Sequence, residues 1–308
     1  MQELSKLDQH FQILTKDDYN IVYDYIKKYP SENCDFNMNT LFSWGQYFKL
    51  EYTIFQERLL LFNPFYGYLL APIGEKFSAQ ELYQINNCCE KIHKKVEIMV
   101  VSEKYINTTP ELSEYFTIYN DIDWNDYIYS VDDLVNLSGK KLAKKKNLIS
   151  QFVRNYPNWT VKQIQKEDIN DIVEFSNYWK KTHTEVTTTT SKETDNDYLA
   201  IELQALQISL QNWDFLPNDG IKLYIDNKLV AFAIFSQQTD DMVTIHFEKY
   251  DPFIKGAGQM INYQSAIFFK DKFKYINREQ DMGIEGIRQA KRSYQPIKLL
   301  PFYRLKSK

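Results

Sequence analysis

The chain has 308 residues, of which 44% are hydrophobic, and this length is enough for about two domains of roughly 150 residues each. Nine glycines and nine prolines exclude a low-complexity or fibrous protein, and Cys34, Cys88 and Cys89 supply neither a disulfide framework nor a CxxC metal motif. The net charge of −4 gives no global reason to expect nucleic-acid binding, so we expect a globular protein without a metal site.

Three features of the sequence bear on where the protein resides. Its opening stretch, MQELSKLDQHFQILTKDDYN, is polar and charged, which is not the pattern of a signal peptide. No window approaches the ~18 consecutive apolar residues that a membrane-spanning helix needs. The cysteine usage fits a reducing compartment. We therefore expect a cytoplasmic protein with no transmembrane segment.

The first half of the chain predicts strands and helices in alternation. Apolar residues recur with helical spacing after Thr15, which suits an N-cap, and Ser78 with Glu81 forms a capping box at the start of a second helix. Apolar and β-branched runs around these helices predict strands. The predicted order is a strand (10–14), a helix (15–30), two or three antiparallel strands (52–74), a helix (78–95) and a strand (96–102).

The second half repeats this coarse order. Its predicted hairpin turns at Asp226-Asn227-Lys228, a sequence suited to a tight turn. The predicted elements are a strand (159–165), two helices (166–183 and 197–213), the hairpin (221–237), a strand (241–251), a helix (258–273), a strand (274–280), and a short helix with a last strand within 284–308.

The repeat predicts two α+β domains, each a mixed, mostly antiparallel sheet flanked by helices. We expect an N-terminal domain at residues 1–130, a lysine-rich linker helix at 131–155 and a C-terminal domain at 156–308. The linker carries five lysines and no acid between Gly139 and Gln151, which fits either a solvated helix face or a patch for RNA or anionic lipid. Residues 183–197, with four consecutive threonines, predict a flexible loop that would act as a lid.

A row of polar residues marks the strand MVTIHFEKYD. With a period of two, Thr244, His246, Glu248 and Tyr250 share one face, and the other face is mostly apolar. An imidazole, a carboxylate and a phenol in one row are the groups that acid–base chemistry uses. The alternative is an outer strand whose polar side is simply solvated.

The segment after that strand contains a turn that opens a helix. Lys255, Gly256, Ala257, Gly258 and Gln259 would present free backbone N–H groups at the positive end of the helix dipole, which suits a phosphate or carboxylate. The pattern is neither a P-loop nor GxGxxG. A plain tight turn is the alternative interpretation.

The stretch YINREQDMG predicts a second polar strand. Asn277, Glu279 and Asp281 fall on one face and Arg278 on the other. Strand, turn, helix and strand make a β-α-β unit, so this strand and the one that carries His246 are expected to be parallel neighbours. Clustered carboxylates suit a general base, and Arg278 would orient one of them. A structural ion-paired network is the alternative.

The order of elements resembles the GNAT acyltransferase fold, in which a G-x-G turn cradles the pyrophosphate of acyl-CoA. More narrowly, the chain is similar to an uncharacterised bacterial family related to the C-terminal domain of phosphatidylglycerol lysyltransferases. The segments that carry this resemblance are NCDFNMNTLFSW, YIYSVDDLVNLSGKKLAKKKNLISQF, HFEKYDPFIKGAGQMINYQSA and YINREQDMGIEGIRQAKRSYQPIKLL, of which the last is the most specific.

The resemblance implies two GNAT-like domains in tandem, as in the Fem-type aminoacyl ligases that take amino acids from aminoacyl-tRNA. The first half has no G-x-G turn before a helix, so it would be a degenerate domain, and the site would lie in the second half. The donor would be acyl-CoA or aminoacyl-tRNA, with no covalently bound cofactor. The acceptor would be a small molecule, a peptide or a lipid, and tRNA would be a partner if it is the donor.

These inferences predict an acyl- or aminoacyltransferase that acts on an amine or hydroxyl acceptor. The alternative is a non-catalytic GNAT-like protein that binds a ligand or a partner. The expected catalytic residues are Glu248, Glu279, His246 and Tyr294, and the expected donor-binding residues are Lys255, Gly256, Ala257, Gly258 and Gln259. The expected substrate-binding residues are Tyr250, Asn262, Asn277, Arg278, Asp281 and Lys291.

Overall fold

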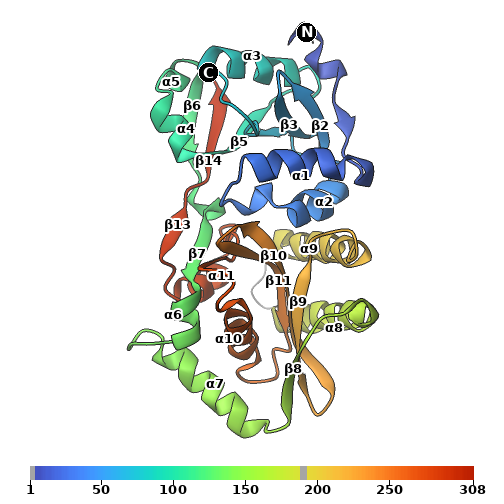
Figure 1. The fold of residues 1–308 in the computed structure, drawn as a ribbon, viewed down its shortest axis with the longest axis vertical. Helices are drawn as coiled ribbons and strands as arrows, with labels where there is room; N and C mark the ends of the chain where they lie inside the picture. Colours follow the sequence, from blue (N-terminus) through green and yellow to red (C-terminus); the bar gives the residue numbers. More distant parts are fainter. Residues whose placement is uncertain (1–3, 188–192) are drawn as a thin grey trace. The chain divides into compact units, whose positions relative to one another are not determined.

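The computed structural model describes residues 4–187 and 193–308, and the chain divides into two compact units (Figure 1). Unit 1 contains Met1–Asp126, Gln280–Ile284 and Leu299–Lys308, and unit 2 contains Tyr127–Glu279 and Glu285–Lys298. Within the described residues each unit is built on a seven-stranded mixed sheet with flanking helices, which confirms the predicted fold class.

Unit 1 begins with short elements and continues as an antiparallel meander. The predicted capping box is present, because the Ser78 hydroxyl and backbone N–H both donate to the Glu81 carboxylate at the start of α3. The elements of unit 1 are η1 (Leu4–Gln9), β1 (Gln12–Ile13), η2 (Lys16–Asp18), α1 (Tyr19–Lys28), η3 (Cys34–Phe36), α2 (Met38–Tyr47), β2 (Glu51–Phe55), β3 (Arg58–Asn63), β4 (Tyr68–Leu70), α3 (Ala79–Cys89), β5 (Glu97–Val101), α4 (Glu103–Thr108), α5 (Leu112–Tyr115), β6 (Phe116–Asn120), η4 (Ile122–Trp124) and β14 (Tyr303–Ser307).

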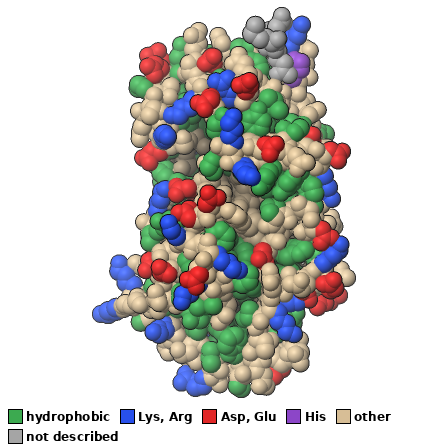
Figure 2. Space-filling model, in the orientation of Figure 1, with side chains coloured by type: hydrophobic (Ala, Val, Ile, Leu, Met, Phe, Trp, Pro, Cys, Tyr) green, Lys and Arg blue, Asp and Glu red, His purple; other side chains and the backbone are tan. Residues whose placement is uncertain are grey.

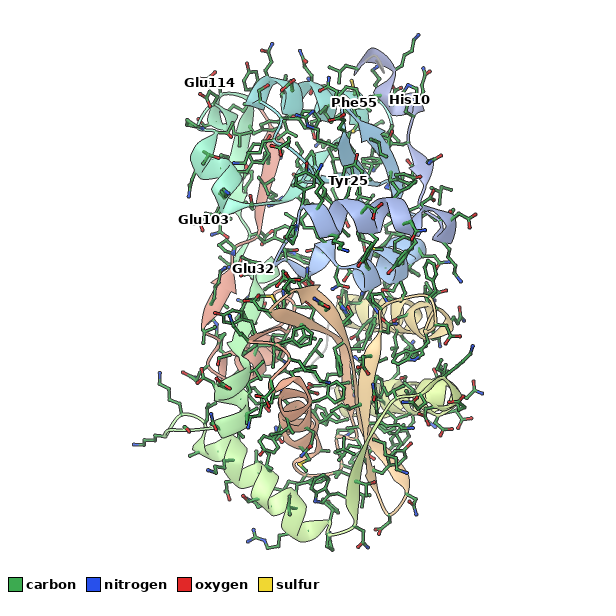
Figure 3. All side chains as sticks on the ribbon, viewed as in Figure 1. His10, Tyr25, Glu32, Phe55, Glu103 and Glu114 are labelled. Atoms are coloured by element: carbon green, nitrogen blue, oxygen red, sulfur yellow. The ribbon has the colours of Figure 1, made fainter. Side chains whose placement is uncertain are left out.

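The sheet of unit 1 has the order β1-β2-β3-β4-β5-β14-β6. Strands β1 to β4 are antiparallel, and β4 is parallel to β5 through the crossover helix α3. The core of this unit packs α3 against the sheet and includes Phe55, whereas the side chains of Glu103 and Glu114 are exposed on α4 and α5 (Figure 3). The carboxylates therefore lie in water and the apolar helix face lies on the sheet.

Unit 2 repeats the plan with longer strands. The predicted hairpin turn is present, because Asp226 and Asn227 both have positive φ values, 49° and 65°, as a two-residue type I′ turn requires. The elements of unit 2 are β7 (Asp126–Ser130), α6 (Val131–Asn136), α7 (Ala143–Asn155), β8 (Trp159–Gln163), η5 (Lys166–Asp168), α8 (Ile169–Thr187), α9 (Glu193–Gln211), β9 (Asp219–Ile225), β10 (Lys228–Thr239), β11 (Met242–Tyr250), α10 (Ala257–Phe269), β12 (Tyr275–Asn277), α11 (Glu285–Arg292) and β13 (Lys298–Leu300).

The sheet of unit 2 has the order β13-β7-β12-β11-β10-β9-β8. The predicted parallel pair is present: Thr244 of β11 lies opposite Asn277 of β12, and α10 is the crossover between them. In Figure 1 the helices α8 and α9 lie on one side of strands β8 to β11, and α10 lies on the other. A core of aromatic and aliphatic residues joins α10 to the sheet.

The two halves of the chain exchange a strand. In the sheet of unit 1, the strand next to β5 is β14, which comes from the end of the sequence. In the sheet of unit 2, the strand next to β12 is β7, which follows the first half of the sequence. The units therefore differ from the expected 1–130, 131–155 and 156–308 division, because Leu299–Lys308 belongs to unit 1 and β7 from Tyr127 onward belongs to unit 2.

The lysine-rich segment 131–155 is two helices rather than the predicted single one. Helix α6 ends at Asn136, its C-cap Leu137 has a left-handed φ of 46°, and α7 begins at Ala143. Leu134 of α6 and Phe152 of α7 are both in the core of unit 2. The segment is therefore a packed part of this unit, although Val153 is exposed and Lys145 is half-buried while its other lysines are exposed.

Helices occupy the described parts of the predicted loop 183–197. Helix α8 continues to Thr187 and α9 begins at Glu193, while residues 188–192, with most of the threonine run, lie outside the described residues. The proposed lid therefore has no structural description. Across the described ranges, each helix is too short or too polar to cross a bilayer.

Candidate functional site

The polar strand β11 contains a β-bulge that changes the predicted faces. Ile234 of β10 pairs with Phe247 and Phe235 pairs with Ile245, so His246 is the extra residue. A one-residue insertion moves every later side chain to the other face. Glu248 and Tyr250 therefore lie on the α10 side, whereas Thr244, which precedes the bulge, lies on the α8 and α9 side.

This result corrects the expectation that Thr244, His246, Glu248 and Tyr250 form one row. The assignment of faces is supported from both sides. Ile245 belongs to the core that contains α10, and Lys249 binds Glu202 of α9. The alternation of residue types cannot reveal the bulge, because a bulge leaves the residue types unchanged and shifts only their pairing.

Glu248 and Arg278 form the centre of the α10 side of the site. The guanidinium Nη2 of Arg278 donates to Glu248 Oε1 at 2.9 Å, and the two side chains are 13% and 14% exposed. With its amide oxygen turned toward Arg278, Asn262 of α10 accepts from Nη1 at 2.7 Å and from Nη2 at 3.3 Å. Burial would disfavour the guanidinium, but the Glu248 carboxylate and the neighbouring phenols raise the pKa of Arg278.

The second carboxylate oxygen of Glu248 has no hydrogen-bond partner within the described residues, although it is buried. A buried polar atom without a partner costs on the order of 1–3 kcal/mol. The Arg278 side of the carboxylate is already occupied. Glu248 Oε2 therefore keeps acceptor capacity that no described group of the chain uses.

Three tyrosines surround this ion pair. The Arg278 guanidinium lies 5.3 Å from the ring centroid of Tyr294 and 5.8 Å from that of Tyr129. Burial raises the pKa of the Tyr250 and Tyr294 hydroxyls, and the negative charge of Glu248 contributes to both shifts. Both phenols are therefore neutral at physiological pH and can donate a proton or a hydrogen bond.

Lys145 of α7 brings a further cation to Tyr294. Lys145 is half-buried, and its Nζ lies 4.1 Å from the ring centroid of Tyr294. Burial lowers the pKa of Lys145, and the charges of Arg278 and Lys144 lower it further. The lysine-rich segment thus reaches the edge of the site through one side chain, a contact that its charge pattern alone does not predict.

The predicted proximity of His246 and Glu279 is confirmed, by a geometry that the sequence did not predict. His246 Nδ1 lies 3.0 Å from Glu279 Oε1. Strand β12 ends at Asn277 instead of continuing to Asp281, and Glu279 has a left-handed φ of 56°. The Asn277 side chain accepts from the Glu279 N–H at 2.7 Å and stabilises this turn.

Other parts of unit 2 pack closely against both glycines of the G-x-G turn. A Cβ on Gly256, whose φ is 89°, would lie 2.8 Å from the backbone oxygen of Leu148 in α7. A Cβ on Gly258 would lie 2.8 Å from the Tyr250 ring. Both glycines and Ala257 are buried, whereas Lys255 is exposed and Gln259 is half-buried. Packing alone accounts for the glycines, so their pattern does not by itself indicate a phosphate site.

The remaining expected substrate-binding residues have structural partners. Lys291 of α11 donates from Nζ to the backbone oxygen of Arg278 at 2.6 Å and so supports the turn that carries it. Asp281 belongs to unit 1, where it is fully buried and accepts from the Gly283 N–H at 2.9 Å. Unit 2 thus brings together Glu248, Arg278, Asn262, Tyr250 and Tyr294, and Asp281 is used elsewhere.

Three residues of the site were missed by sequence reasoning. Tyr129 comes from the exchanged strand β7, Lys145 from α7, and Ser236 from β10, where its Oγ lies 2.8 Å from His246 Nε2. Serine and lysine are common on any surface, and a tyrosine in a core strand is usually a packing residue. Only the three-dimensional pairing identifies them.

The fold and the site together define a tandem GNAT-like protein: two sheets of the same plan, each with a parallel strand pair joined by a helix, and a carboxylate at the point where β11 and β12 separate. Within this class the chain belongs to the family "Phosphatidylglycerol lysyltransferase, C-terminal", which matches residues 26–306. The description of this family is that of a lysyltransferase domain, which supports a transferase.

Solved structures support the assignment of the fold. A conserved protein of unknown function from Bacteroides thetaiotaomicron is 29% identical, with a TM-score of 0.85 and coverage of 97% of this chain and 99% of that one. The C-terminal domain of a putative lysylphosphatidylglycerol synthetase from Agrobacterium fabrum is 13% identical, with a TM-score of 0.63 over 96% of this chain and 92% of that one. The second likeness concerns the fold alone.

One curated relative was found at lower coverage. An uncharacterised protein of Mycoplasmoides gallisepticum is 24% identical over 182 residues, which are 59% of this chain. The match spans 56% of that protein, so little more than half of its length is represented.

Proposed function

We propose that this protein is an acyl- or aminoacyltransferase that uses Glu248 as the proton acceptor for an amine or hydroxyl acceptor. The observation that carries the proposal is the buried, unbonded Oε2 of Glu248 beside an Oε1 that Arg278 already occupies. A carboxylate held at one oxygen, with unused acceptor capacity on the other, is oriented as a general base requires.

The proposed reaction has one proton leaving the acceptor and one reaching the leaving group. The acceptor N–H or O–H donates to Glu248 Oε2 while its nitrogen or oxygen attacks the donor carbonyl. The bond from the carbonyl carbon to the donor sulfur or oxygen then breaks. The Tyr294 hydroxyl, kept neutral by its raised pKa, gives its proton to that leaving atom. Transfer of the proton from Glu248 to the Tyr294 phenolate restores the resting state.

The donor is proposed to bear phosphate groups, as both acyl-CoA and aminoacyl-tRNA do. Lys255 is exposed beside the turn, and the turn packs on α7, whose first residues include Lys144 and Lys146. On the face seen in Figure 2, basic and acidic side chains are interspersed. The lysines of α7 are therefore a local source of positive charge rather than part of a uniformly basic face.

The test compares wild-type protein with Glu248→Gln, which keeps an oxygen for Arg278 and removes the base. Thiol release from acetyl-CoA and loss of the ester of lysyl-tRNA are measured with a panel of amines and polyols, and donor binding is measured by calorimetry. We expect one donor to be consumed, and turnover to fall about 100-fold in Glu248→Gln with donor binding retained.

The alternative of non-catalytic binding is favoured by the burial of Gly256 and Gly258, which leaves their backbone closed to a ligand in this conformation. It predicts that a donor or acceptor binds but is never consumed by wild-type protein. If neither donor binds nor is consumed, the transferase proposal is wrong. Equal turnover by wild type and Glu248→Gln would refute the role of Glu248 while leaving the activity.

A further inference from the structure

A second polar system in unit 2 is a chain of three side chains, separate from the Glu248 ion pair. Ser236 Oγ lies 2.8 Å from His246 Nε2, and His246 Nδ1 lies 3.0 Å from Glu279 Oε1. The three residues come from β10, from the bulge of β11 and from the turn after β12. Three separate elements therefore converge on one imidazole.

The chain starts on the face of the sheet opposite Glu248. Ser236 pairs with Thr244, which precedes the bulge and lies on the α8 and α9 side. The bulge residue His246 reaches Ser236 with one ring nitrogen and Glu279 with the other. A regular strand would place residue 246 on the same face as Thr244, so the bulge is what directs this imidazole between two partners.

Of the three side chains, only that of Glu279 is exposed to an appreciable degree. Ser236 is 2% exposed, the His246 side chain is 1% exposed and the Glu279 side chain is 22% exposed. A ligand can thus reach the carboxylate but neither the imidazole nor the hydroxyl. Glu279 is the accessible end of the system, and Ser236 is the enclosed end.

The engagement of both ring nitrogens changes the role expected for His246. A neutral imidazole has one N–H and one free lone pair, and here each nitrogen already has a partner. His246 therefore cannot take a proton directly from the acceptor substrate. This differs from the direct catalytic role that the sequence predicted for it. An ionised Glu279 only accepts, so Nδ1 must carry the proton, and in the neutral ring Nε2 accepts from the Ser236 hydroxyl.

We propose that Ser236 and His246 are positioning residues that fix the carboxylate of Glu279 as a second proton-accepting group of this protein. Glu279 holds His246 in the Nδ1–H tautomer, Ser236 fixes the ring by donating to Nε2, and the Nδ1–H in turn holds Glu279 Oε1. The strained backbone of Glu279, braced by Asn277, places the carboxylate within reach of the ring. The kinetic part of this proposal rests on the proposed transferase function, and the tautomer does not.

The first experiment measures the tautomer of His246 without any substrate. The chain has 4 histidines, so long-range ¹H–¹⁵N correlation spectra of histidine-labelled protein are simple, and His246→Gln assigns the signal. We expect the Nδ1–H form in wild-type protein and in Ser236→Thr, which keeps a hydroxyl. In Ser236→Ala we expect the Nε2 resonance to shift, because Nε2 loses its hydrogen-bond donor, while the Nδ1–H that Glu279 accepts is kept.

The second experiment uses the donor that wild-type protein consumes. Ser236→Ala is expected to lower kcat about 10-fold with KM unchanged, and Ser236→Thr is expected to restore it. Glu279→Gln should lower kcat at least as much. An Nε2–H tautomer in wild-type protein, or nitrogen signals that Ser236→Ala leaves unchanged, would overturn the proposal even if turnover is never observed. Absence of turnover in wild-type protein would instead count against the transferase function.

Discussion

Glu248 and Arg278 are bound through a single carboxylate oxygen, and the other oxygen of Glu248 is buried without a partner in the described part of the chain. One oxygen of the Glu248 carboxylate is therefore held by Arg278, and the other keeps unused acceptor capacity. Removal of Arg278 leaves the Glu248 carboxylate buried without a counter-ion. Removal of Glu248 leaves a buried guanidinium that still donates to Asn262.

Replacement of Arg278 by Met should lower the free energy of unfolding by about 3–5 kcal/mol, because it leaves the Glu248 carboxylate buried without its counter-ion. Urea denaturation at pH 7 gives the value. Lys140→Met, on an exposed lysine of the 131–155 segment, is the control and should change the stability by less than about 0.5 kcal/mol. A loss below about 1 kcal/mol in Arg278→Met would contradict the view that Glu248 depends on Arg278 as its buried counter-ion.

Tyr294 makes stability depend on alkaline pH. Burial raises the pKa of its phenol in the folded state, an effect that the positive charge of Arg278 only partly offsets. The unfolded chain ionises first, near the ordinary tyrosine pKa of about 10, so this contribution is complete below that pH and is lost as the pH rises above it.

The matched variant is Tyr294→Phe, which keeps the ring next to Lys145 and removes the hydroxyl. Wild-type protein should lose more unfolding free energy than Tyr294→Phe between about pH 9.5 and pH 11. Urea unfolding at a series of pH values measures the difference. Parallel curves for the two proteins across that range would show that the Tyr294 hydroxyl is not held neutral by the fold.

Lys249 and Glu202 form a buried pair on the opposite side of the sheet. The Lys249 ammonium donates to both Glu202 carboxylate oxygens at 2.7 Å and lies 4.0 Å from the ring centroid of Trp179. Glu202→Ala should therefore lower the free energy of unfolding by about 3–5 kcal/mol, whereas the double change Glu202→Leu with Lys249→Met should recover most of the loss.

The control for this pair is the exposed ion pair of Lys166 and Asp214, whose side chains are 66% and 60% exposed. Asp214→Asn should change the stability by less than about 1 kcal/mol, since water screens such pairs. Similar losses in Asp214→Asn and Glu202→Ala would contradict the buried character of the Lys249 pair. Thermal and urea unfolding both provide the comparison.

Gly256 of the turn and Gly286 of α11 should respond in opposite ways to substitution by alanine. A Cβ at Gly256 meets backbone atoms of α7 at a positive φ, so Gly256→Ala should cost more than about 1 kcal/mol. Gly286 has open space around it within α11, and Gly286→Ala should stabilise by about 0.5–1 kcal/mol. Differential scanning calorimetry of both variants decides the matter, and a neutral Gly256→Ala would mean that the turn is less tightly packed on α7.

The fold follows from the sequence wherever local patterns decide it. Hydrophobic periodicity, the capping box at Ser78 and the turn at Asp226 and Asn227 predict elements that the structure contains. The strand exchange could not be predicted in this way, because the residue pattern of β7 or of β14 does not indicate which of the two sheets that strand joins. Pairing between distant strands depends on tertiary contacts that a single sequence does not record.

Some of the residues that cluster in unit 2 were predicted from the sequence, but their geometry was not. The parallel pairing of β11 and β12 brings His246 and Glu279 together as expected. The bulge at His246 and the early end of β12 at Asn277 then separate the expected single row into two systems on opposite faces. The alternation of side chains predicts faces correctly only while the strand stays regular. Strands near functional sites are often interrupted by bulges.

The exchange of β7 and β14 has a consequence during synthesis on the ribosome. Strand β14 lies between β5 and β6, so the sheet of unit 1 stays open between those two strands until residues 303–307 have emerged. Most of unit 1 is made first, yet it is the last sheet to close. A nascent chain stalled after β13 would present two unsatisfied strand edges, a state that chaperones and neighbouring chains can recognise.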